Sequence, residues 1–143
     1  MNDNRAVGVA PGWFIIAAVG ALLWEVLGCG IFLMTVITDP AAMPLDQRVA
    51  IEATPTWMNA AWCFAVLVGL VGTALLIVRN RKAEPLLLLS FLAVLVQFSG
   101  MFLVPRLRNL VESDDLFIPF VVALICYGIW HLARHARREG WLR

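Results

Sequence analysis

Charged residues are scarce in this sequence, and so are cysteine, histidine and tyrosine. Asp, Glu, Lys and Arg make up 15% of the chain, whereas soluble globular domains average about 25%. Hydrophobic residues make up 62% of the 143 residues, and a water-soluble domain of this size has too little interior to bury so many. The composition therefore excludes a soluble globular protein and indicates that lipid surrounds much of the chain.

Cysteine and histidine are too few to build a metal centre or a disulfide framework. The three cysteines are an odd number and all stand inside apolar segments, which is typical of small buried hydrophobes. His131 and His135 are spaced to share a helix face, but no third ligand accompanies them and both follow the apolar core. We therefore expect no metal and no cofactor.

The sequence also lacks the patterns of common enzymes and of nucleic-acid-binding proteins. It contains no Ser/His/Asp set, no phosphate-binding glycine loop and no dedicated carboxylate pair. A net charge of +1 does not favour nucleic acid or an acidic partner. We expect neither an enzyme nor a nucleic-acid-binding protein.

Four apolar segments are long enough to cross a bilayer. Crossing requires about 20 apolar residues in a helix, because only a helix satisfies its own backbone hydrogen bonds in lipid. The segments cover residues 12–37, 57–78, 85–104 and 116–133. The first is too long for a cleaved signal peptide and contains Glu25. The fold class is therefore all-α: one transmembrane domain, an up-down four-helix bundle covering residues 1–143.

The connection 39–56 is the only long one. Three prolines punctuate it, and Pro44 precedes "LDQRVAIEA", which predicts a short helix at the membrane interface.

The basic residues predict the orientation of the bundle. Lys and Arg concentrate in cytoplasmic segments. Eight of the eleven fall on one side of the predicted topology; they are Arg5, Arg79, Arg81, Lys82, Arg134, Arg137, Arg138 and Arg143. We therefore expect both termini in the cytoplasm, with membrane lipids as partners and the last arginines near anionic headgroups.

The first three predicted helices each carry a stripe of small or polar residues. Such stripes let helices approach closely in lipid and hydrogen-bond to one another. The predicted facing positions, helix by helix, are Ala17, Ala21, Glu25 and Gly28; Ala61, Ala65, Gly69 and Thr73; and Ser90, Ala93, Gln97 and Gly100. The fourth helix has a less clear pattern, in which Pro119, Ala123, Tyr127 and Trp130 fall on a common side.

Glu25 is an ionisable residue inside a membrane span. Counted from Trp13 and Pro85, Glu25 and Gln97 each lie twelve residues into their helices, about 18 Å deep. We expect Glu25 to be uncharged in lipid and to donate a hydrogen bond to Gln97, with Tyr127 within reach. Two interpretations stay open: a structural polar clamp, or the lining of a polar cavity that recognises a solute or a proton.

The segments "ALLWEVLG" (21–28) and "AVLVQFSG" (93–100) match at Ala, at Glu against Gln, and at Gly. This match predicts two related helix hairpins.

Several short motifs resemble those of a family of small bacterial four-span membrane proteins that automated naming often labels "sugar transporter". They are "LLWE" (22–25), "MP" (43–44), "EATPTW" (52–57), "GLVGTALLI" (69–77), "VLVQ" (94–97) and "GWL" (140–142). Relatives commonly have asparagine where this chain has Glu25, and a neutral hydrogen-bonding role fits both residues. The resemblance implies four spans, a bacterial inner membrane and sugar transport.

Two classes of function follow from these observations. As a transporter of a small solute, the chain would act as a homo-oligomer, because four spans enclose little space. Glu25, Gln97 and Tyr127 would contact the solute, and Trp24 or Trp62 would stack on a sugar face. The alternative is an accessory or structural subunit of a larger membrane complex, in which the polar pair only sets the helix register.

Overall fold

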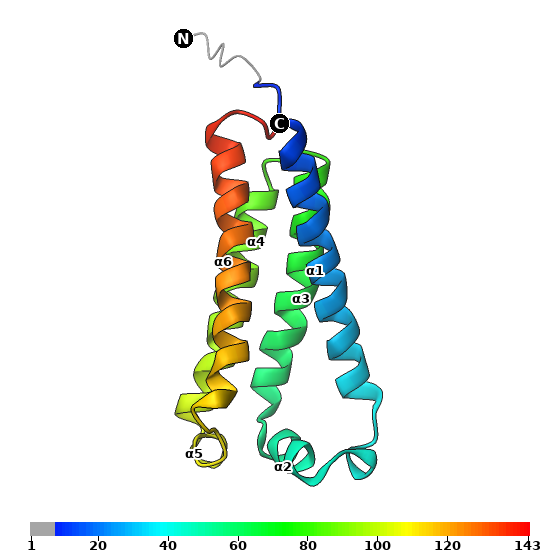
Figure 1. The fold of residues 1–143 in the computed structure, drawn as a ribbon, viewed down its shortest axis with the longest axis vertical. Helices are drawn as coiled ribbons and strands as arrows, with labels where there is room; N and C mark the ends of the chain where they lie inside the picture. Colours follow the sequence, from blue (N-terminus) through cyan, green and yellow to red (C-terminus); the bar gives the residue numbers. More distant parts are fainter. Residues whose placement is uncertain (1–7) are drawn as a thin grey trace.

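Four long helices form an antiparallel bundle in the computed structural model, which describes residues 8–143 (Figure 1). All four are long and apolar enough to cross a membrane, so the chain has the architecture of a multi-pass membrane protein. They are α1 (Gly12–Ile37), α3 (Thr56–Ile77), α4 (Ala83–Leu103) and α6 (Phe117–Arg138). The segment before α1 and the C-terminus lie at one end of the bundle, called here the terminal end.

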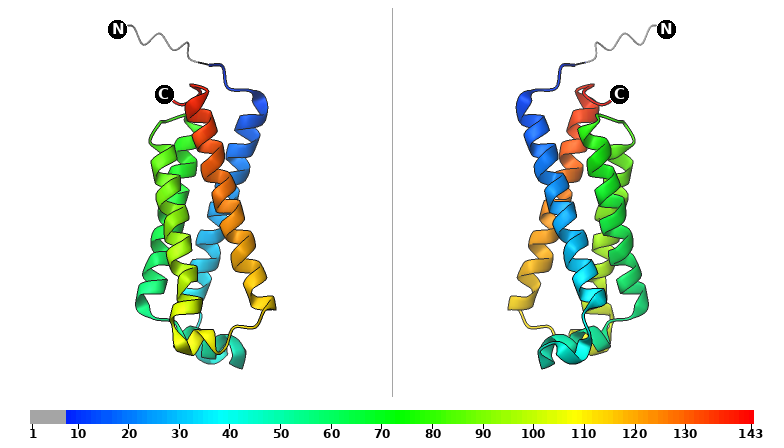
Figure 2. Two further views of the ribbon diagram at one scale, coloured as in Figure 1. Left: turned by 90° about the vertical axis from the view of Figure 1, so that its left-hand side faces the viewer. Right: turned by 90° about the vertical axis from the view of Figure 1, so that its right-hand side faces the viewer.

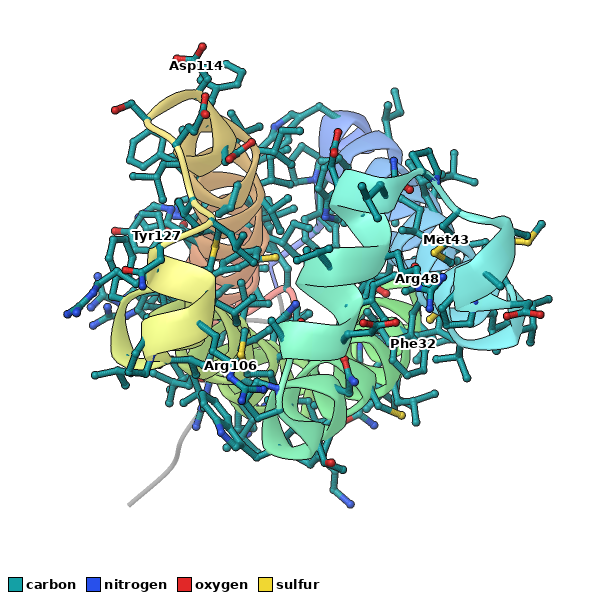
Figure 3. All side chains as sticks on the ribbon, turned by 90° about the horizontal axis from the view of Figure 1, so that it is seen from below. Phe32, Met43, Arg48, Arg106, Asp114 and Tyr127 are labelled. Carbon is teal, nitrogen blue, oxygen red and sulfur yellow. The ribbon has the colours of Figure 1, made fainter. Side chains whose placement is uncertain are left out.

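Short helices close the opposite end, called here the loop end. α2 (Leu45–Ala53) is the predicted interfacial helix, and Figure 3 shows it lying across the bundle. The other short elements are η1 (Pro40–Ala42), α5 (Pro105–Arg108) and η2 (Asp114–Leu116). Proline precedes α1, α2 and α3 directly, which suits helix starts because proline has no N–H to leave unpaired.

The middle of the bundle is built around α3, which packs against both α1 and α4, and α4 in turn packs against α6. Glycines allow the closest approaches: a Cβ built on Gly72 would lie 2.9 Å from Leu87 Cγ. α1 and α6 complete the circle with little contact (Figure 2). Large apolar side chains on the outside of each helix, such as Leu23, Leu67, Leu95 and Leu124, are exposed, as expected where lipid is the solvent.

An apolar plug seals the terminal end. Phe14, Leu76 and Leu142 are fully buried there and pack in one cluster with alanines of α1, α4 and α6. The C-terminal residues join the α3–α4 loop through the backbone: the Arg81 N–H donates to the Arg143 carbonyl at 3.0 Å. The plug therefore ties the last residues of the chain to the middle of the sequence.

The predicted all-α fold with four helices able to span a membrane is confirmed, and the helices lie within a few residues of the predicted segments. α1 coincides with 12–37, whereas α6 runs on to Arg138, past the predicted end at 133. Arg5, used to predict the orientation, lies outside the described residues, and the hairpin repeat stays a prediction.

The last helix buries Cys126, Ile129, Ala133 and Ala136. Of the residues that the sequence groups on one side of this helix, Ala123 and Trp130 pack against the buried clusters. Tyr127, by contrast, is 44% exposed, so it does not point into the bundle.

Gly72→Ala should lower the free energy of unfolding by about 1–3 kcal/mol, because the new methyl group overpacks the α3–α4 contact at Leu87. Unfolding by sodium dodecyl sulfate in mixed micelles, followed by circular dichroism, measures the change. Gly20→Ala is the matched control, since a Cβ there meets nothing within 4 Å. Equal stability of the two variants would contradict the close packing of α3 on α4.

Candidate functional site

A cavity of about 370 Å³ lies at the loop end, between the ends of α1, α3 and α4 and beside α2. Its lining is a mixture of apolar and uncharged polar side chains. The residues are Phe32, Thr35, Val36, Thr38, Pro40, Ile51, Thr54, Met58, Asn59, Trp62 and Gln97. The cavity thus collects the polar residues that the helices carry near this end.

The two amides of the cavity have free hydrogen-bonding capacity. Asn59 is exposed at the cavity mouth and Gln97 is half-buried. Within residues 8–143 neither forms a side-chain hydrogen bond, and each amide offers donors and an acceptor. The hydroxyls of Thr35, Thr38 and Thr54 instead donate to carbonyls one turn earlier, at 2.6–2.9 Å. Their lone pairs remain as acceptors, so a ligand would find amide donors and several acceptors in one cavity.

Trp62 provides the aromatic wall. Its ring meets Phe32 edge to face, with centroids 5.2 Å apart and an interplanar angle of 77°. This contact joins α1 to α3 and holds the indole in place beside the amides. None of the lining residues is charged, so the site is chemically suited to a neutral polar molecule.

Glu25 lies elsewhere, in the middle of the bundle. Its side chain is buried, with 6% exposed, and it faces α3 and α4. A Cβ built on Gly69 would lie 2.6 Å from Glu25 Cδ and 2.9 Å from Ser90 Oγ. The carboxyl and the hydroxyl therefore converge on the bare backbone of Gly69.

The polar groups around Glu25 are already engaged. The Ser90 hydroxyl donates to the Ala65 carbonyl at 2.8 Å, and the Thr73 hydroxyl donates to the Gly69 carbonyl at 2.9 Å. Within the described part of the chain, Glu25 itself has no side-chain hydrogen bond and no salt bridge. It is a buried acid held by packing.

The predicted pairing of Glu25 with Gln97 is not formed. Ser90 is the α4 residue beside Glu25, and Gln97 lies seven residues further along α4, about 10 Å away along the helix axis. The prediction assumed that residues equally far from the starts of their helices lie at the same depth in the membrane. Ser90 is only seven residues into α4 while Glu25 is thirteen into α1, because α1 extends further at the terminal end.

The five predicted site residues therefore separate into different places. Gln97 and Trp62 line the cavity. Trp24 lines a shallow groove between α1 and α6, of about 300 Å³. Tyr127 packs on Phe91 with ring centroids 5.8 Å apart, and it lies across the bundle from the cavity residue Phe32 (Figure 3).

Sequence reasoning missed Asn59 and the three threonines of the cavity. A signal was present: Asn59 precedes Trp62 by three residues and Thr35 follows Phe32 by three, which places each polar residue on the face of an aromatic one. The prediction considered polar residues at mid-membrane depth, whereas Asn59 and the threonines lie near the ends of their helices.

Comparisons with protein-family models, with curated proteins and with solved structures each gave no match to the chain. The site's chemistry is therefore inferred from its own residues.

Gly69→Ala should destabilise the bundle by about 1–3 kcal/mol, because the added methyl group occupies the position that the Glu25 carboxyl contacts. Glu25→Ala opens that space, so the double variant should recover part of the loss, with a coupling of about 0.5–3 kcal/mol. A double-mutant cycle measured by unfolding in mixed micelles tests the contact.

Gly30→Ala is the control for this cycle, since a Cβ at Gly30 has open space around it. Additive effects of Gly69→Ala and Glu25→Ala would show that the two residues do not touch.

Proposed function

We propose that the chain is a bacterial inner-membrane protein that binds a small, uncharged, sugar-like solute in the loop-end cavity and carries it across the membrane as a homo-oligomer. The observation that supports this best is the lining of the cavity. Two unpaired amides, Asn59 and Gln97, stand with Trp62 in a space of about 370 Å³ that has no charged side chain on its walls.

This lining suits a polyhydroxylated molecule. Each amide offers both donors and an acceptor, which matches hydroxyl groups that also donate and accept. The indole of Trp62 offers an apolar face for the C–H side of a sugar ring. Apolar walls with a few oriented polar groups are typical of small-molecule sites.

The two ends of the bundle differ in a way that favours transport. The cavity lies at the loop end, while Phe14, Leu76 and Leu142 fill the terminal end. A solute would cross only after the plug rearranges, so the arrangement corresponds to one state of an alternating-access cycle. Four spans enclose little space by themselves, which is why the proposal places the complete pathway in an oligomer.

The charge distribution supports an orientation with the termini in the cytoplasm. Among the described residues the terminal end carries seven basic side chains, in the α3–α4 loop and after Trp130, while the loop end carries Arg48, Arg106 and Arg108. This asymmetry follows the positive-inside rule. The cavity would then face the periplasm and receive solute from outside the cell.

An accessory subunit is the second candidate. The groove between α1 and α6 supports an accessory role. Gly20 and Gly128 contribute no side chains to its lining, so a helix of another protein could approach the backbone closely. Such a subunit would co-purify with a larger membrane complex in mild detergent and show no uptake in liposomes. A transporter would show uptake by itself.

Neutral polyols should bind the purified protein and quench its tryptophan fluorescence. We would test glucose, ribose, inositol and glycerol, with glucuronate and glucosamine as charged counterparts. Gln97→Met keeps the side-chain volume and removes the amide, so affinity should fall about two- to tenfold. Gln47→Met, on the exposed side of α2, is the control and should change nothing.

Trp62→Ala should weaken binding further, and Trp57→Ala is its control because Trp57 is an exposed residue at the same end of α3. Preference for a charged sugar, no binding of any neutral polyol, or equal affinity of Gln97→Met and the parent would contradict the proposal.

The proposed orientation makes Ser113→Cys reactive toward a membrane-impermeant maleimide added to intact spheroplasts, and leaves Glu139→Cys protected until the membrane is opened. Both positions are exposed, at opposite ends of the bundle, and the three native cysteines lie inside the spanning helices. The reverse labelling pattern would invert the topology.

A further inference from the structure

Glu25 stands between the cavity and the apolar plug. On α1, Ala21 belongs to the plug cluster one turn before Glu25, while Phe32 and Thr35 line the cavity about two and three turns after it. On α3, Leu76 belongs to the plug and Trp62 to the cavity, with Gly69 midway. The buried carboxyl thus lies between the plug and the cavity, and a second apolar cluster of Ala65, Val94 and Cys126 packs the bundle on its cavity side.

The surroundings of the carboxyl provide no counter-charge. α3 presents the backbone of Gly69, and α4 presents the hydroxyl of Ser90, which already donates to Ala65. The titratable groups nearby are two thiols, Cys29 on α1 and Cys126 on α6. Within residues 8–143 no lysine, arginine or histidine pairs with Glu25, so the packed state shown here favours the neutral acid.

The Glu25 side chain is 6% exposed and forms no hydrogen bond with the described residues. Its carboxyl oxygens are not fully enclosed: within residues 8–143 the one enclosed side-chain polar atom without a partner is Trp130 Nε1. The neighbouring Ser90 hydroxyl, by contrast, donates to the Ala65 carbonyl across the α3–α4 contact. Glu25 therefore differs from the structural hydroxyls around it, because its acid group is unpaired and keeps a small accessible surface.

We propose that Glu25 is a proton-binding site that couples proton uptake to the opening and closing of the cavity. With its proton, the neutral acid packs against Gly69 and Ser90 and the bundle is closed at this level. When α1 moves away from α3, water from the cavity reaches the carboxyl and accepts its proton. Rebinding reverses this step: an O–H bond forms on the carboxylate as hydronium gives up its proton, and no other bond changes.

Two features connect this site to the cavity. The plug closes the terminal end, so water would reach the carboxyl from the loop end once the apolar cluster of Ala65, Val94 and Cys126 separates. α1 carries Glu25 together with Phe32 and Thr35, so a displacement of α1 alters the carboxyl contact and the cavity wall at once. The coupling part of this inference rests on the proposed function, whereas proton binding by Glu25 does not.

The test uses dicyclohexylcarbodiimide, an apolar reagent that modifies protonated carboxyl groups in membranes. The full chain in phosphatidylcholine vesicles is treated across a range of pH, and adducts are located by mass spectrometry of peptides. We expect an adduct on Glu25 in mildly acidic buffer that falls about tenfold for each pH unit above the midpoint. Glu25→Gln should lose it, while Glu52→Gln, a change at an exposed α2 carboxyl, should keep it.

Infrared spectroscopy of the unmodified chain provides a second measurement that needs no variant to fold. The carbonyl stretch of a protonated carboxyl group in an apolar environment should disappear as pH rises, with the same midpoint as the labelling. An adduct and a band that persist unchanged at every pH would make Glu25 a permanently neutral structural residue and overturn the proposal. Absence of both at acidic pH would also overturn it.

Solute experiments separate this proposal from the proposed function. If neutral polyols bind and their affinity does not change with pH in the parent chain, the coupling is wrong while solute binding stands. If no polyol binds but Glu25 still titrates, the proposed function fails and the proton site stands.

Discussion

The close approach of α3 to α1 and α4 is the contact on which the rest of the bundle depends. Gly69 and Gly72 leave no side chain in these interfaces, so Glu25 and Leu87 reach the α3 backbone. In lipid there is little hydrophobic drive between helices, and close packing with a few polar contacts holds them together. The positions of the plug, the buried acid and the cavity all depend on how α1 and α4 pack against α3.

The two halves of the bundle differ in the size and polarity of the side chains between the helices. Toward the terminal end, alanines on α1, α4 and α6 let the helices close around Phe14 and Leu76. Toward the loop end, the helices carry larger and more polar side chains, and α2 lies across them (Figure 3). The bundle thus joins a sealed apolar half to a half that holds an uncharged polar cavity.

Polar residues in the spans illustrate how far sequence reasoning reached. Periodicity placed Glu25, Gly69 and Ser90 on inward faces, and all three are buried. It paired Glu25 with Gln97, however, because it assumed that the helices start at one level. It also grouped Tyr127 with Ala123 and Trp130 on α6, whereas Tyr127 is exposed and the adjacent Cys126 is buried.

The sequence by itself determined the number of spans, the start of α1, the short helix α2 and the small-residue faces of the first three spans, because lipid demands long apolar helices and prolines precede several of them. Only the tertiary structure decided which residues share a level: Glu25 with Gly69 and Ser90, and Asn59 with Trp62 and Gln97. The reason is physical. Helix stagger and rotation arise from contacts between side chains distant in the chain, and no local pattern records them.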